Sequence, residues 1–549
     1  MIISKTNDGK NIYLSWREGE EKKAEVKPFR PYFYVLDTEK EIPKYNASKY
    51  IVRDFTYEKG DWINLDNEPL KRVYVENAFD IKKAQNYFIR TFEADVPYHF
   101  RYSVDNINEM PEYKMRKWYW DMEWQQGGEH HDKITTIVMY DNYDEKYYQW
   151  VWFPKKKKIG RMPNHDMFIF NNEKDMLESF MTTMVNKDPD MLIAWFGNFA
   201  DVPKLLDRVC KLGLNPLVMS PIASIKGVKK VEDGFKFAYA ENGFNPIEQP
   251  IGGRITLSLE TAFERQWNDS QRGTLPSLSL DYIGETVLGK NKLESEKFAD
   301  KNEFYRKGWL QDTETYLQYA LKDVELIVEI DETNFCSEAI LSLQRLLKAP
   351  FDACFYASHM GSIYFMRNAG WKAPTGTKVE KRVTYEGAMI YDPLSENTNG
   401  LHLGVAAFDY SGLYPSMIVA RNISWETISD EPTKFAVNIL TPRDFSETNR
   451  EEMVYFKTDK LGLLPQAVLD LKELRTEYKN LMREARETDN GEYAKWYNNQ
   501  MAVKRLSASF YGILAFQGFG WANVSLAASI TASAREAIRL AAFKAKEME

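Results

Sequence analysis

The chain has 549 residues, 44% of them hydrophobic, which is too long for one core and sufficient for several packed domains. Its 72 Lys and Arg against 80 Asp and Glu give a net charge of −8, which excludes a protein that is basic overall but not one whose cations line a single channel. The 3 cysteines show no metal-ligand spacing and no apolar run reaches membrane length, so we expect no disulfide framework and a soluble protein of the reducing cytoplasm.

Residues 1–105 alternate short β-rich runs with turn residues and contain one helical stretch near residues 80–92. This pattern predicts a small α+β domain. The strand that follows, KWYWDMEW at residues 117–124, carries Asp121 and Glu123 two residues apart. Because side chains alternate along a strand, both carboxylates lie on one face, where they repel each other unless a cation lies between them.

Two later segments also carry acids in ordered positions. Asp201 follows a buried strand and lies at the turn that opens a helix, whereas Tyr319 and Asp323 are four residues apart on an amphipathic helix and share its face. Each acid alone would be interpreted as a solvated surface group or a helix cap. Four acids and a tyrosine in the order strand, turn and helix are much harder to explain that way.

A second set of patterns lies beyond residue 335, where the chain becomes helical. The string VTYEGAMIYDP places Gly before Ala, a pair that permits close approach of a nucleic-acid strand or forms a simple turn. At Ala406–Ala420, AAFDYSGLYPSMIVA runs into Asp409, bends, and continues as a second apolar run. A carboxylate before a turn with outward N–H groups can present a divalent metal beside a phosphate, although an isolated Asp favours an ordinary turn.

Two long helical patterns, residues 463–487 and 490–516, predict a helical hairpin with its turn at residues 489–491. Cations and aromatics recur on its faces at helical spacing, namely Arg475 with Lys479, and Lys504 with Ala508 and Tyr511. Exposed Lys and Arg on helices are usually only solvated, so spacing alone assigns them no function.

In chain order, these strings resemble the family B DNA polymerases of archaeal and viral type. The resemblance implies a multidomain fold that combines α/β and α+β domains and has no thumb. Its parts would be an amino-terminal domain (1–105), a ribonuclease H-like 3′→5′ exonuclease domain of the DEDD type (106–335), a helical linker that completes the amino-terminal domain (336–384), the first part of the palm (385–455), helical-hairpin fingers (456–515) and a palm helix (516–549).

For the exonuclease, the resemblance implies a site for two divalent cations, Mg²⁺ or alternatively Mn²⁺, held by Asp121, Glu123, Asp201 and Asp323. One cation would lower the pKa of a bound water and the other would steady the leaving 3′ oxygen, while Tyr319 orients the water. The chain has Phe196 where the family usually has Asn, and Ala200 where it usually has Phe. The grip on the substrate strand is therefore expected to differ.

For the polymerase, the resemblance implies a second divalent-cation site held by Asp409 and the carbonyl of Tyr410. It also implies a dNTP site made of Gly412, Leu413, Tyr414, Arg475, Lys479, Lys504, Tyr511 and Gly512, and a template contact made of Tyr385, Gly387 and Ala388. The backbone N–H groups and the cations would bind the triphosphate, and Tyr414 would exclude a 2′-hydroxyl. Gly412 and Ala508 replace the family's usual Ser and Asn, which removes two polar contacts.

Relatives carry a second catalytic aspartate after the palm helix, followed by the thumb, and neither occurs in these 549 residues. Because one carboxylate poorly offsets two divalent ions, we expect either a split proofreading polymerase completed by a second polypeptide or a truncated piece. The alternatives are a stand-alone 3′→5′ exonuclease with a vestigial polymerase region and a non-catalytic DNA-binding scaffold. The expected partners are primer-template DNA and, as a further candidate, a sliding clamp. The departures from the family pattern suggest a viral origin. We would then expect the protein in the cytoplasm of the host cell.

Overall fold

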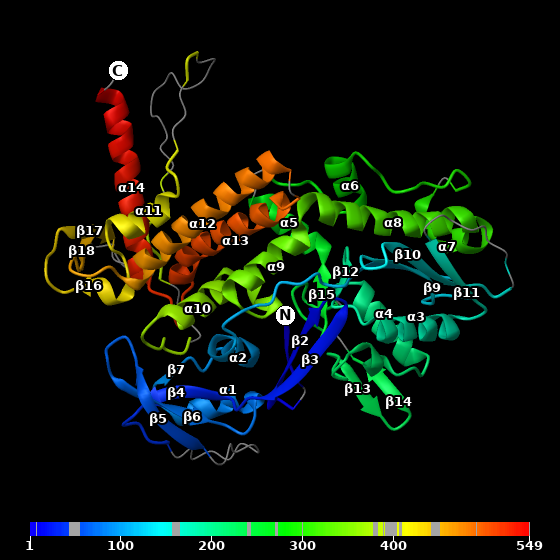
Figure 1. Cartoon of the computed structure of the whole chain (residues 1–549), viewed down its shortest axis with the longest axis horizontal. Coiled ribbons are helices and arrows are strands. Elements are labelled where there is room, and N and C mark those ends of the chain that lie inside the picture. Colours follow the sequence, from blue (N-terminus) through cyan, green and yellow to red (C-terminus); the bar gives the residue numbers. More distant parts are fainter. Residues whose placement is uncertain are drawn as a thin grey trace. The chain divides into compact units, whose positions relative to one another are not determined.

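The structure is a computed structural model of the chain (Figure 1). It describes residues 1–6, 8–42, 55–155, 157, 165–238, 243–269, 273–298, 300–376, 383–387, 389, 403–405, 409–440, 451–489 and 491–547. The chain divides into two compact units, Met1–Phe29 with Asp105–Phe355, and Arg30–Val104 with Tyr356–Glu549. The amino-terminal domain expected at residues 1–105 is thus shared between the two units.

The first unit contains a six-stranded mixed sheet in the order β11-β10-β9-β8-β12-β15. Strand β9 runs antiparallel to both neighbours, whereas β8, β12 and β15 run parallel to one another. The strands are β8 (Lys117–Trp124), β9 (Ile134–Asp141), β10 (Lys146–Trp152), β11 (His165–Phe170), β12 (Met191–Ala194) and β15 (Ile255–Ser258). The helices are α3 (Glu173–Lys187), α4 (Asp201–Lys211), α5 (Leu259–Asp269), α6 (Leu280–Leu288), α7 (Lys301–Gln311), α8 (Thr313–Asn334) and α9 (Cys336–Leu347).

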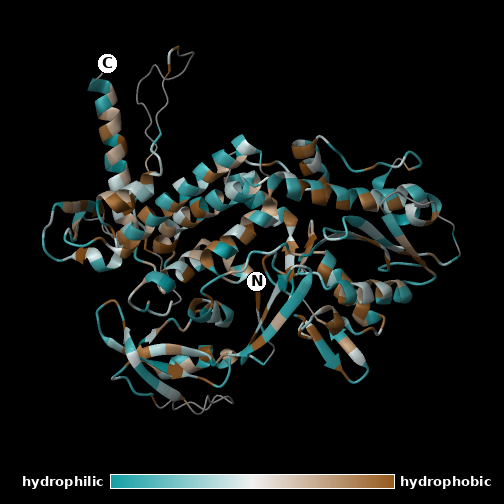
Figure 2. Ribbon diagram, viewed as in Figure 1, coloured by the Kyte–Doolittle hydropathy of each residue, from teal (hydrophilic) through white to brown (hydrophobic). Residues whose placement is uncertain are grey.

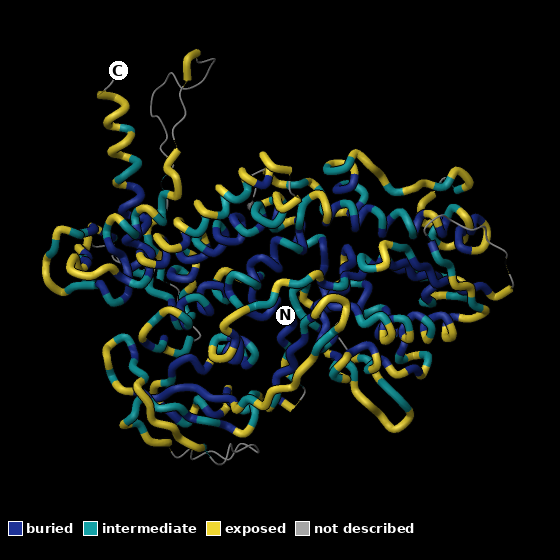
Figure 3. The backbone as a smooth tube through the Cα atoms, in the orientation of Figure 1, coloured by how far each residue is buried: buried dark blue, intermediate teal, exposed yellow. Residues whose placement is uncertain are grey.

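Strand β8 divides its side chains between the two faces of this sheet. Trp118 and Trp120 pack against Phe180 of α3 on one face. On the other face the Tyr119 hydroxyl donates to Asp331 of α8 at 2.8 Å. The alternation of side chains along a strand therefore places the odd-numbered residues of β8 beside α8. In Figure 3 the strands of this sheet are largely dark blue, which marks them as buried.

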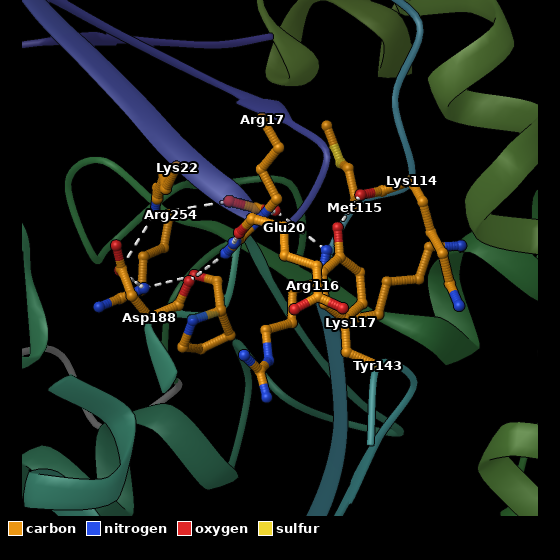
Figure 4. A network of polar contacts seen from close by, with 12 residues as sticks. Arg17, Glu20, Lys22, Lys114, Met115, Arg116, Lys117, Tyr143, Asp188 and Arg254 are labelled. Atoms are coloured by element: carbon orange, nitrogen blue, oxygen red, sulfur yellow. Dashed lines mark hydrogen bonds and ion pairs between the residues drawn. The ribbon is translucent and has the colours of Figure 1, made fainter. Parts of the chain in front are cut away.

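Two smaller sheets complete the first unit: β1 (Ile2–Lys5), β2 (Asn11–Glu18) and β3 (Glu21–Pro28) in one, and β13 (Val228–Val231) with β14 (Gly234–Phe237) in the other. A buried ionic network ties β2 and β3 to the large sheet (Figure 4). Arg17 Nε pairs with Asp190 Oδ2 at 2.5 Å, and Lys22 and Arg254 both pair with Asp188. The contacts of Arg17 and Lys22 join segments more than 160 residues apart in sequence.

The second unit combines two small sheets with a set of long helices. Its strands are β4 (Tyr32–Leu36), β5 (Thr56–Ile63), β6 (Pro69–Tyr74), β7 (Thr91–Phe92), β16 (Ile428–Ser429), β17 (Phe435–Leu440) and β18 (Glu451–Phe456). Its helices are α1 (Ile81–Ala84), α2 (Tyr98–Asn106), α10 (Ala357–Asn368), α11 (Leu413–Ala420), α12 (Leu463–Thr488), α13 (Tyr493–Ala515) and α14 (Val524–Glu547). The helical hairpin predicted from the sequence is present as α12 and α13, which lie side by side in Figure 1.

The helices of the second unit pack through one aromatic core. Phe365 of α10 contacts Phe510 of α13 with ring centroids 4.9 Å apart, and Trp425 and Trp521 surround the same ring. Gly361 permits this close crossing, since a Cβ there would lie 1.6 Å from Ile513 Cδ1. Figure 2 shows teal turns alternating with brown ones along α12, as expected of a helix with one solvent-facing side. Within the described ranges, no helix is both long and apolar enough to cross a membrane.

Candidate functional site

The first candidate site is a cluster of carboxylates between β8 and α8. Asp121 and Glu123 project from β8 on the face that α8 covers, and Asp323 projects from α8. One oxygen from each of the three lies within 4.8 Å of the others. The predicted period of two in β8 and the predicted helix around Asp323 are therefore confirmed, and together they bring these acids to one place.

Asp201, the fourth predicted acid, is the first residue of α4 and is 5% exposed. It follows β12, which runs parallel to β8. Asp201 therefore lies at the edge of the sheet where the carboxyl end of β8 also lies. Its negative charge is, after burial, the main reason why the pKa of Asp121 lies well above the ordinary range. Asp201 thus lies beside the cluster without joining the group of three mutually close oxygens.

Burial makes ionisation of these acids costly. It raises the pKa of Glu123 to about 8, with the charge of Asp323 contributing, and raises the pKa of Asp201 to about 7. Like charges in a low-dielectric site resist deprotonation until a cation compensates them. The Asp323 Oδ1 atom is buried and, among the described residues, has no hydrogen-bond partner. Buried carboxylate oxygens with an open coordination position fit a hard divalent cation such as Mg²⁺.

Lys292 is a site residue that the sequence reasoning missed. Its Nζ donates to Asp323 Oδ2 at 2.6 Å and to the Tyr319 hydroxyl at 3.1 Å. Burial lowers the pKa of Lys292, but Asp323 and Asp121 outweigh that effect and raise it above its ordinary value. The backbone N–H of Lys292 donates to Asp281 Oδ1 at 2.8 Å, which fixes the segment after α6. The ammonium therefore links Tyr319 to the carboxylates.

Tyr319 shares the face of α8 with Asp323, as its four-residue spacing predicts. Burial, followed by the charges of Glu123 and Asp323, raises its pKa well above the ordinary range. The hydroxyl therefore keeps its proton at neutral pH and remains a donor.

The loop before Asp201 holds the departures noted in the sequence. Phe196 is 41% exposed, so its ring is not part of the core. Asn198 fixes the loop: its N–H donates to Ser258 Oγ at 3.0 Å and its Nδ2 donates to the Glu248 carbonyl at 2.7 Å. The loop is thus anchored by β15 and the segment before it, with aromatic surface left at the solvent.

The second candidate site is a cavity of about 900 Å³ between α11, α12, α13 and α14. Its lining includes six of the eight nucleotide-binding residues predicted from the sequence, namely Gly412, Leu413, Tyr414, Arg475, Lys504 and Tyr511, together with Ala508. Gly412 has φ of +69°, in the left-handed region that favours glycine, and directly precedes α11. Burial lowers the pKa of Arg475, which remains a cation at any ordinary pH.

Tyrosines form one wall of this cavity. The rings of Tyr414 and Tyr511 lie 4.7 Å apart, and the hydroxyls of Tyr385 and Tyr511 are 2.8 Å apart. The segment after Tyr385 is held from α14, because Arg535 Nη1 donates to the carbonyls of Glu386 and Gly387, each at 2.7 Å. Arg535 is therefore a second structural contributor that the sequence reasoning did not single out.

The remaining predicted residues lie outside the cavity lining. Lys479 lies near other cations, and the charge of Arg475 is the main cause of its lowered pKa. Asp409 and Tyr410 are exposed, and the Tyr410 hydroxyl donates to the Ala537 carbonyl at 3.0 Å. Gly512 lies on α13 with open space where a Cβ would be. Ala388 lies outside the described residues, as do residues 406–408, which lead into Asp409.

Comparisons with known proteins match the two regions of the chain in which these sites lie. Residues 358–548 match the family described as "DNA polymerase family B", and residues 121–281 match "DNA polymerase family B, exonuclease domain". The DNA polymerase of Pyrococcus glycovorans is 25% identical over 99% of this chain and 67% of its own length. DNA polymerase 1 of Pyrococcus abyssi is 25% identical over 97% of this chain and 67% of its own length. The chain thus spans about two thirds of the length of these relatives.

A solved structure shares the fold. The family B DNA polymerase of the archaeon Pyrobaculum calidifontis superposes with a TM-score of 0.68 over 99% of this chain and 71% of that chain, at 17% identity. At this identity the likeness concerns the fold.

Proposed function

The chain belongs to the family B DNA polymerases, and we propose that it carries both a 3′→5′ exonuclease and the nucleotide-binding part of a DNA-directed DNA polymerase. The observation that carries the exonuclease is the group of half-buried Asp121 and Glu123 and buried Asp323, with oxygens within 4.8 Å of one another. Such a concentration of negative charge is costly unless it serves to bind cations. The proposed substrate is the 3′ end of a DNA strand.

In the exonuclease, Asp121, Glu123, Asp201 and Asp323 would hold divalent cations, Mg²⁺ with Mn²⁺ as the alternative. Bound cations of this kind lower the pKa of water and stabilise charge on the leaving oxygen. Burial raises the pKa of Asp323, and Lys292 opposes this rise and favours the ionised carboxylate through their 2.6 Å ion pair. The protonated Tyr319 hydroxyl, held by the same ammonium, is a donor that orients the attacking water.

In the polymerase, the cavity would accept a dNTP. Three cations, Lys472, Arg475 and Lys504, line the same space as the backbone at Gly412 and Leu413, so a triphosphate would meet donors on two sides. The ring of Tyr414 would limit the space beside the sugar and select against a 2′-hydroxyl. The segment from Tyr385 to Gly387 would contact the template.

We further propose that phosphoryl transfer to a primer needs carboxylates besides Asp409, because one carboxylate poorly offsets two divalent ions. Asp409 itself is exposed in this structure. A second polypeptide with the rest of the palm and a thumb, as expected from the sequence, would supply them. The sliding clamp as a partner and the viral origin remain predictions from the sequence. Primer extension by the 549 residues alone, and then with a carboxy-terminal palm-and-thumb chain added, tests the requirement. Unaided extension would refute it.

The exonuclease is tested with a 5′-labelled single-stranded oligonucleotide and Mg²⁺. We expect a ladder of products shortened from the 3′ end, and its loss in Asp121→Ala. The matched control is Asp132→Ala, since Asp132 is an acid of the same unit whose carboxylate pairs with Lys204 and Lys211 instead. Equal hydrolysis by wild type and Asp121→Ala would refute the assignment. If the chain is a stand-alone exonuclease, it should hydrolyse DNA without binding a dNTP. If it is a non-catalytic DNA-binding scaffold, it should show neither hydrolysis nor dNTP binding.

A further inference from the structure

A second tyrosine approaches the exonuclease centre from a different helix. Tyr305, on α7, places its hydroxyl 3.4 Å from the Tyr319 hydroxyl, and the two rings meet edge to face with centroids 5.8 Å apart. The backbone carbonyl of Tyr305 accepts from Gln125 Nε2 at 3.2 Å, in the segment just after β8. The backbone at Tyr305 is therefore held from the segment after β8, and the Tyr305 side chain contacts Tyr319 through both its ring and its hydroxyl.

The hydrogen-bonding capacity of Tyr319 explains why this position matters. A phenol oxygen can accept two hydrogen bonds and donate one. Lys292 has only donors, so its ammonium occupies one acceptor position of the Tyr319 oxygen at 3.1 Å. If Tyr305 donates as well, both acceptor positions are filled. The Tyr319 proton is then left to point toward the carboxylates and whatever lies among them.

The opposite direction, with Tyr319 donating to Tyr305, is disfavoured by charge. The acceptors on the centre side are carboxylates, whereas the Tyr305 side offers a neutral hydroxyl. Hydrogen bonds to charged acceptors are stronger than neutral ones, so the Tyr319 proton favours the centre. The oxygen separation of 3.4 Å is longer than a typical O–H···O bond. Hydrogen bonds between catalytic groups are often long in the absence of substrate and shorten when the substrate complex forms.

We propose that Tyr305 is a positioning residue of the exonuclease: its hydroxyl donates to Tyr319 and thereby directs the Tyr319 proton at the attacking water. The inference rests on the proposed exonuclease function. It assigns to α7 a part in the reaction that is exerted through Tyr319. It follows that Tyr305 acts only while Tyr319 has its hydroxyl.

The test is Tyr305→Phe, which keeps the ring and removes only the hydroxyl. On a single-stranded oligonucleotide with Mg²⁺ we expect kcat to fall about fivefold, the effect of losing one neutral hydrogen bond, with KM unchanged. In a Tyr319→Phe background the same change should have no further effect, because its point of action is gone. Tyr148→Phe is the control: this tyrosine, on β10 of the same unit, donates its hydroxyl to Asp144 Oδ2 at 2.8 Å, and Asp144 pairs with Arg116 and Lys187 instead of the centre. It should lower the melting temperature and leave kcat unchanged.

The outcomes separate the two proposals. Normal hydrolysis by wild type together with wild-type kcat in Tyr305→Phe would overturn the role of Tyr305 and leave the exonuclease intact. A further loss in the double variant, equal to that in the single one, would also overturn it, since Tyr305 would then act independently of Tyr319. If wild type itself shows no cation-dependent hydrolysis, the proposed function fails and this inference fails with it.

Discussion

Replacing Asp121 by Asn should stabilise the protein when no divalent cation is bound. One oxygen each of Asp121, Glu123 and Asp323 lies within 4.8 Å of the others. At that separation and an effective dielectric constant of about 20, two ionised carboxylates repel by roughly 3 kcal/mol. Lys292 offsets part of this repulsion, and protonation removes more of it. We therefore expect a net gain of about 2 kcal/mol from Asp121→Asn, a rise in Tm of about 4–8 °C.

The effect should grow with pH. Burial raises the pKa of Glu123 to about 8 from its ordinary value of 4.5, so between these values the folded protein binds more protons than the unfolded chain. Stability from this group is thus present at low pH and lost as the pH rises through about 8. In Asp121→Asn the loss should be smaller, because one repelling charge is missing.

Thermal melts in EDTA at pH 6 and pH 8.5, and again with Mg²⁺, measure both effects. Asp132→Asn is the control, because Asp132 has cationic partners and its replacement should lower Tm. We expect Mg²⁺ to raise the Tm of wild type and to leave Asp121→Asn nearly unchanged. The reasoning is refuted if Asp121→Asn melts below wild type in EDTA at pH 8.5, as the control does.

Other regions of the chain give independent predictions. Arg17→Met breaks the buried pair with Asp190 and should lower the free energy of unfolding in urea by about 3 kcal/mol, the lower end for a broken buried pair, because Lys22 Nζ, 3.5 Å from Asp190 Oδ1, still offsets part of the charge; an unchanged urea midpoint would contradict this. Burial lowers the pKa of His165 to about 4 from 6.5, so stability should be lost as the pH falls from 6.5 to 4, by at most about 3 kcal/mol, and His165→Gln should flatten that part of the curve. Arg475→Ala should weaken dNTP binding at least about tenfold by calorimetry, the effect of losing a charged hydrogen bond, whereas an equal Kd would remove Arg475 from the proposed site.

Regular spacing made part of the exonuclease site predictable. The period of two in β8 placed Asp121 and Glu123 on one face, and the helical period of α8 placed Tyr319 with Asp323. Asp201 was predicted at a helix start and is the first residue of α4. Each prediction needed only local geometry within one element, which the sequence pattern determines directly.

Contacts made through segments without periodicity were not predictable. Lys292 lies between α6 and α7, outside any helix or strand, and reaches Tyr319 across 27 residues of sequence. Arg17 meets Asp190 across 173 residues, which is why residues 1–29 pack with a unit that local β-patterns did not assign them to. Such pairings depend on how whole elements pack, and no spacing within a segment indicates them.

The claim on which most of this account depends is that the clustered carboxylates of β8 and α8 bind the cations that a 3′-end hydrolysis requires. Mn²⁺ titration followed by electron paramagnetic resonance, with hydrolysis measured in the same samples, tests it most directly. We predict that Asp323→Asn binds fewer Mn²⁺ ions than wild type and loses hydrolysis in parallel. Wild-type Mn²⁺ binding and wild-type hydrolysis in Asp323→Asn would contradict it.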